Sequence, residues 1–67
     1  MQNNNYEVEE VMNYGIEYWA ALIYRIESRG IKVLPITKSI VNQLELKGSV
    51  SPKQASILMN FKHAFDK

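Results

Sequence analysis

The chain has 67 residues, a net charge of +1 and 46% apolar residues, a composition typical of one small folded domain rather than a disordered segment. It contains no Cys and a single His, His63, which excludes disulfides, Cys-based zinc sites and any two-His metal motif within these residues. A domain of this size buries only about 60% of the surface of its unfolded chain. Association with itself or with a partner is therefore the expected source of added stability.

The sequence predicts neither secretion nor a membrane span. The first ten residues lack the basic start and apolar run of a signal peptide. The longest apolar run, "YWAALIY", is far shorter than the roughly 20 residues that cross a bilayer, and Arg25 ends it. We therefore expect a soluble, cytoplasmic protein with no membrane association, and no motif indicates a cofactor.

The first predicted helix covers about residues 5–29, and we expect residues 1–3 before it to be frayed. Asn4 and Glu7 have the spacing of a capping box, and Gly30 follows the last turn as a C-cap glycine. Steps of four and three residues place one apolar stripe along this helix: Val8, Met12, Gly15, Trp19, Leu22 and Ile26.

A second, shorter helix is predicted over about residues 37–47. Because Pro35 disfavours helical geometry at the residue before it, the helix is expected to start after this proline, with Thr37 as its N-cap. Ile36 and Val41 would then pack together across the cap as a hydrophobic staple. Gly48 is expected to end the helix.

A third helix is predicted over about residues 52–65. Ser51 is its expected N-cap, Pro52 takes the first helical position, and Gln54 completes a capping box. The residues expected to be buried are Ile57, Leu58, Phe61, Ala64 and Phe65. The sequence thus predicts one all-α domain over residues 1–67, in which a short helical hairpin packs on a long N-terminal helix.

The two short helices raise the hypothesis of a DNA-reading helix-turn-helix. If Gly48 is the turn glycine, the small position of that motif falls on Leu44 and its early apolar position falls on Gln54, and neither residue fits. The better interpretation of residues 48–54 is that one packed helix ends at Gly48 and the next begins after Ser51. Catalysis is not indicated either, since His63 and the serines have no partner at a suggestive spacing. We expect a non-catalytic protein with no small-molecule substrate.

The predicted helix lengths carry the main functional prediction. At 1.5 Å per residue the three helices would be about 36, 16 and 21 Å long, so the hairpin covers little more than half of the first helix. Its apolar N-terminal end would stay exposed, which a soluble monomer normally avoids. We expect this end to dock on a protein partner, most simply on a second copy in a homodimer through the first helix. The alternative is that the helix kinks at Gly15 and folds its first turns onto the hairpin.

The leading prediction is a small helical protein that acts by protein–protein contact, for example an adaptor, or an inhibitor encoded by a phage or a mobile element. Its interface would be the N-terminal half of the first helix: Tyr6, Val8, Val11, Met12, Tyr14 and Tyr18. Glu7, Glu9 and Glu10 would form an acidic rim. The alternative is a nucleic-acid-binding protein that contacts phosphates, without base readout, through Lys32, Lys38, Lys53 and Lys62.

Overall fold

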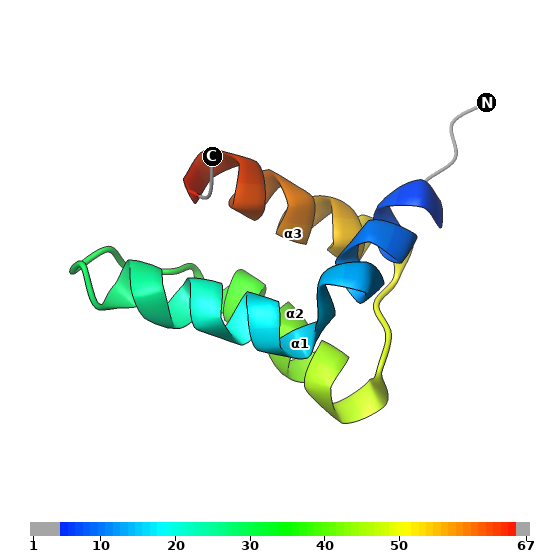
Figure 1. Cartoon of the computed structure of the whole chain (residues 1–67), viewed down its shortest axis with the longest axis horizontal. Coiled ribbons are helices and arrows are strands. Elements are labelled where there is room, and N and C mark those ends of the chain that lie inside the picture. The colour runs from blue at the N-terminus through cyan, green and yellow to red at the C-terminus, as the bar shows by residue number, and fades with distance from the viewer. Residues whose placement is uncertain (1–4, 66–67) are drawn as a thin grey trace.

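The structure, a computed structural model, describes residues 5–65 and confirms the all-α fold with three helices (Figure 1). Helix α1 spans Asn5–Glu27, α2 spans Pro35–Lys47 and α3 spans Pro52–Phe65. Each helix packs against the other two. The capping box predicted at Asn4 lies outside the described residues.

Helix α1 is bent at Gly15, whose φ of 85° and ψ of 161° interrupt the helical backbone. These angles lie in a region that essentially only glycine adopts. Residues 5–14, called here the N-terminal arm of α1, run at an angle to the rest of the helix and lie beside the start of α3 instead of extending the helix straight (Figure 1). The straight first helix expected from the sequence is therefore wrong, and the protein adopts the kinked alternative.

The bend carries Val11 into the core. Val11 is completely buried and Val8 packs against the core, whereas Met12 is 40% exposed. The indole N–H of Trp19 donates a hydrogen bond of 3.1 Å to the carbonyl oxygen of Val11. In a straight helix these residues would be about 12 Å apart along the axis. This hydrogen bond therefore depends on the bend and holds the arm against the rest of α1.

The core draws on all three helices and on both connections between them. Its largest completely or almost completely buried side chains are Trp19, Leu22, Leu58 and Val11. The remaining members are Ile23, Ile26, Val33, Ile40, Val41, Leu44, Val50, Ala55 and Met59. Ala64 and Phe65 were predicted to be buried, but both are exposed, because the buried stripe of α3 runs through residues 55, 58 and 59 and ends before the helix does.

Helix α2 begins two residues earlier than predicted. Pro35 occupies its first turn, where a missing N–H costs nothing, and Leu34 is the N-cap with a ψ of 142°. Thr37 therefore lies inside the helix and is buried, and Ile36 is 54% exposed instead of stapled to Val41. The prediction of Thr37 as N-cap is wrong. Leu34 is the extended residue that Pro35 requires before it, so Leu34 is the N-cap and the helix has already begun when the chain reaches Thr37.

The two glycines predicted to end the first and second helices, Gly30 and Gly48, are confirmed in that role, although α1 ends at Glu27, two residues earlier than predicted. The backbone N–H of Gly30 donates to the carbonyl of Glu27 at 3.0 Å, and that of Ile31 donates to the carbonyl of Ile26 at 3.4 Å, which is a Schellman motif. At the end of α2 the N–H of Gly48 donates to the carbonyl of Leu44 at 2.8 Å. Both glycines have a positive φ.

The capping box at the start of α3 is also confirmed, and it has a second role. The N–H of Gln54 donates to Ser51 Oγ at 3.2 Å, and the N–H of Ser51 donates to Gln54 Oε1 at 3.0 Å. The side-chain amides of Gln54 and Gln43 donate to each other's oxygens at 3.1 and 3.2 Å. The capping residue of α3 thus also joins α3 to α2.

We expect Gln54→Ala to lower the free energy of unfolding by about 1–2 kcal/mol, because it removes a cap and a pair of inter-helix hydrogen bonds. Gln54→Glu keeps the oxygen that caps α3 but cannot donate to Gln43, so it should cost less than Gln54→Ala. A double-mutant cycle measures the interaction between the two glutamines: urea unfolding is followed for Gln54→Ala, Gln43→Ala and the variant that carries both changes. We expect a coupling free energy between Gln43 and Gln54 of at least about 0.5 kcal/mol. Asn42→Ala, on an exposed neighbour, serves as the control. Strict additivity would show that the amide pair contributes nothing.

Candidate functional site

The six residues of the predicted interface do not form one exposed surface. Val11 is completely buried and is therefore a core residue, which corrects its assignment to the interface. Val8 and Tyr18 are half-buried against the core. Tyr6, Met12 and Tyr14 remain accessible. The bend explains this outcome, since it turns the predicted stripe inward.

The tyrosines of this set make contacts within the chain. Tyr14 and Tyr18 stack with ring centroids 4.5 Å apart, and the rings of Tyr18 and Trp19 form a T-shaped pair with centroids 5.0 Å apart. Lys62 Nζ of α3 lies 5.3 Å from the Tyr14 ring centroid. The hydroxyl of Tyr6 donates to Glu10 at 3.2 Å, and this carboxylate raises the pKa of Tyr6 above its ordinary value. The aromatic residues around Gly15 thus pack the bend.

The four lysines of the nucleic-acid alternative do not gather on one face. Lys38 pairs with Glu27 at 3.0 Å, and Lys62 lies over Tyr14. Lys53 and Lys62 are nine residues apart, which places them on opposite sides of α3 at 3.6 residues per turn. Lys32 and Lys53 have no ion-pair partner within residues 5–65.

An apolar groove lies between the start of α2 and the last turns of α3. It has a volume of about 290 Å³ and is called here the α2–α3 groove. Its lining residues are Leu34, Ile36, Thr37, Ile57, Asn60, Phe61 and Phe65. These come from segments that lie toward the same end of the molecule (Figure 1).

The rim of the α2–α3 groove consists of large apolar side chains that the fold leaves uncovered. Leu34 is 65% exposed, Ile36 54% and Phe65 43%. The floor is formed by Thr37, which is buried, and by Ile57 and Phe61, which are half-buried against the core. The amide of Asn60 makes no hydrogen bond to any described residue, so the groove offers one polar group that can donate and accept.

The half of the chain that forms the α2–α3 groove carries a positive net charge. Residues 31–65 carry five Lys and one Glu, a net charge of +4, whereas residues 5–30 carry five Glu and two Arg, a net charge of −3. Lys53 lies one turn before Ile57 on the same face of α3. Lys32 and Leu34 both point outward from the extended connection, since the residue between them, Val33, is buried.

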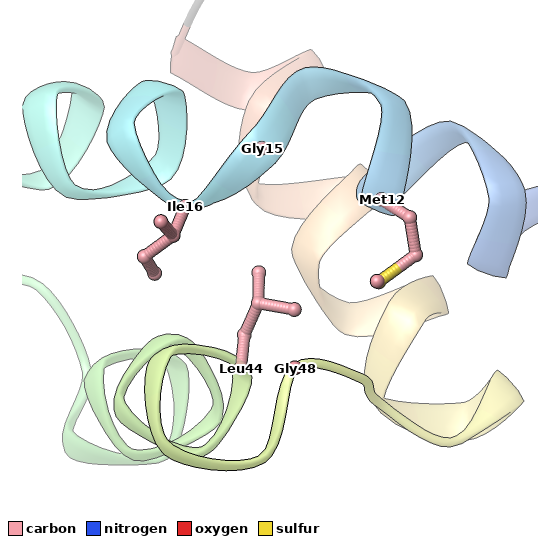
Figure 2. Close-up of a pocket in the computed structure, with 5 residues that line it drawn as sticks. All are labelled: Met12, Gly15, Ile16, Leu44 and Gly48. Carbon is pink, nitrogen blue, oxygen red and sulfur yellow. The ribbon is translucent and has the colours of Figure 1, made fainter.

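A smaller pocket of about 200 Å³ lies where the arm of α1 faces the end of α2. Met12, Gly15, Ile16, Leu44 and Gly48 line it, and the side chains of Met12, Ile16 and Leu44 point into it (Figure 2). It marks the contact between the arm and the turn after α2.

The α2–α3 groove was not among the predicted sites, although one signal in the sequence pointed to it. The segment "IKVLPI" holds four large apolar residues, Ile31, Val33, Leu34 and Ile36, and an extended chain turns only alternate residues inward. Part of this segment therefore had to face outward. The exposure of Phe65 had no comparable signal, because it depends on where the core ends along α3.

Over residues 5–65, no group of three or more His, Asp or Glu side chains gathers where a metal ion could bind. None of the three helices combines the length and the apolar character that a membrane span requires. Comparison with known protein families, curated proteins and solved structures found no match for this chain. The geometry of the chain is therefore the basis for any functional assignment.

Proposed function

We propose that this protein is a small non-catalytic binding protein that holds an amphipathic helix of a partner protein in the α2–α3 groove. The observation that carries this proposal is the row of exposed Leu34, Ile36 and Phe65 side chains along a groove of about 290 Å³. Contiguous exposed apolar surface of this kind is typical of interaction sites. Protein–protein contact thus remains the proposed activity, but its surface moves from the first helix to the opposite ends of α2 and α3.

The shape of the groove favours a helix as the bound element. Two helices form its walls, and an amphipathic helix can place anchors at positions i, i+4 and i+7 between them. A peptide strand would require an open sheet edge, which is not found within residues 5–65. The side-chain amide of Asn60 would meet polar groups at the margin of such a helix.

The charge of the groove favours an acidic partner. Lys32 is two residues from the rim residue Leu34 and Lys53 lies one turn before the floor residue Ile57, and neither has an acidic partner in the described chain. Complementary charges steer association and set specificity more than they add affinity. We therefore propose that the bound helix carries Glu or Asp on the flanks of its apolar face.

The test uses two peptides of about 14 residues, roughly four helical turns, with the same Leu and Phe anchors and either Glu or Lys on the polar face. The acidic peptide is expected to bind at least tenfold more tightly, a difference of about 1.4 kcal/mol. Amide chemical shifts of the labelled protein should change at Ile57, Asn60 and Phe61. Equal affinity for both peptides, or shift changes on another surface, would overturn the proposal.

Variants of the rim separate binding from folding. Leu34→Asn removes an apolar rim residue from the N-cap of α2 while adding a favoured capping side chain, so it should abolish binding without loss of stability. Phe65→Ala should weaken binding in the same way. Leu46→Ala and Tyr24→Ala, each at a residue that is 75% exposed and outside the groove, are the matched controls. Salt-sensitive binding of duplex DNA that survives Leu34→Asn would instead support the nucleic-acid alternative.

A further inference from the structure

We propose that the N-terminal arm of α1 exchanges between two copies of this chain, with Gly15 as the hinge. In the exchanged dimer α1 is straight, and the arm of each copy packs on α2 and α3 of the other. The second copy would supply the same contacts that the arm makes within one chain. This inference concerns α1 and does not depend on the use of the α2–α3 groove.

The hinge is confined to one residue. Gly15 alone departs from helical angles within α1, and the residues on both sides of it are helical. Rotation at this residue is sufficient to convert the bent helix into a continuous one. A continuous helix gains the backbone hydrogen bonds that an interruption prevents, so the open form of α1 is locally favourable.

The arm cannot remain unpaired once it opens. Val11 is completely buried and Val8 packs on the core in the bent form, so opening exposes both together with the cavity that Val11 leaves. Trp19 Nε1 also loses the carbonyl of Val11 as its acceptor. Opening uncovers the surface on which the arm of the same chain had packed. The arm of a second copy is identical and therefore fits this surface, so a second copy is the occupant that we propose.

Gly15 offers two variants with opposite effects on this equilibrium. An added Cβ meets no atom within 4 Å, so Gly15→Ala acts on conformation and not through a steric clash. L-alanine disfavours a φ of 85° and favours a helix. D-alanine, introduced by chemical synthesis, accepts a positive φ and opposes a right-handed helix. We expect sedimentation to show a dimer dissociation constant at least a hundredfold lower for the L-alanine variant than for the D-alanine variant.

A cross-linking experiment distinguishes exchange from ordinary dimerisation. Met12 on the arm faces the turn at Gly48 (Figure 2), and the chain contains no Cys. Met12→Cys combined with Ser49→Cys and a short bis-maleimide should give a link within one chain for the D-alanine protein. The same pair should give a link between chains for Gly15→Ala. A monomeric Gly15→Ala protein at millimolar concentration, or a dimer whose cross-link stays within one chain, would overturn the proposal.

Discussion

Replacing Trp19 with alanine is expected to leave the protein unfolded at room temperature. Trp19 is completely buried, and truncation of a buried Trp typically costs about 3–5 kcal/mol. The core of a domain of this size contributes roughly 3–5 kcal/mol of net stability. The loss therefore equals the whole margin, and far-ultraviolet circular dichroism should show a large decrease in helix content.

Two further variants separate the contributions of Trp19. Trp19→Phe keeps an aromatic ring but leaves the buried carbonyl of Val11 without its donor, which should cost about 1–3 kcal/mol. Tyr24→Ala removes an aromatic residue from the same helix at a position that is 75% exposed, and it should change stability by no more than about 0.5 kcal/mol. A folded Trp19→Ala protein with unchanged helix content would contradict the claim that the fold depends on burial of Trp19.

Gly15→Ala is expected to have the second largest effect, a loss of about 1–3 kcal/mol in the free energy of unfolding of the monomer. The reason is the backbone alone, because the φ of 85° and ψ of 161° at this residue are strained for any L side chain. Urea unfolding at a concentration low enough to keep the protein monomeric would measure this loss.

Gly48→Ala is the matched control for the bend. Gly48 also has a positive φ, but its φ of 78° and ψ of 10° lie in the left-handed helical region, where an L residue costs about 1–2 kcal/mol. Neither glycine has a neighbouring atom that an added Cβ would meet. A loss at Gly15 that is smaller than the loss at Gly48 would indicate that α1 straightens within the monomer at little cost.

Signals between neighbouring residues predicted much of the fold correctly. The capping box of Ser51 and Gln54 and the stop at Gly48 depend on groups within a few residues of each other, and the structure confirms both. The predicted start of α2 was wrong because Pro35 has two effects. It disfavours helical geometry at the residue before it, but it is itself well suited to the first turn of a helix. Both effects are satisfied in the structure, because Leu34 is extended just outside the helix and Pro35 lies in its first turn.

The bend at Gly15 could not be decided from local signals, since it depends on a balance between distant contacts. A glycine costs a helix only about 1 kcal/mol, which is compatible with a straight helix. Burial of Val11 and the hydrogen bond from Trp19 to the Val11 carbonyl favour the bent helix instead, because both contacts depend on the bend. Full burial of a Val side chain contributes about 1.5–3 kcal/mol and a hydrogen bond about 0.5–1.5 kcal/mol. Neither contact can be counted until the positions of α2 and α3 are known.

Trp19 is the only tryptophan of the chain, and its indole is buried at the bend with its N–H bonded to the carbonyl oxygen of the arm. Opening of the arm within a single chain, with no second arm in its place, must bring this ring into contact with water. Intrinsic fluorescence would then shift to longer wavelength without any added dye. The protein thus contains its own optical reporter of whether an arm covers this part of the core.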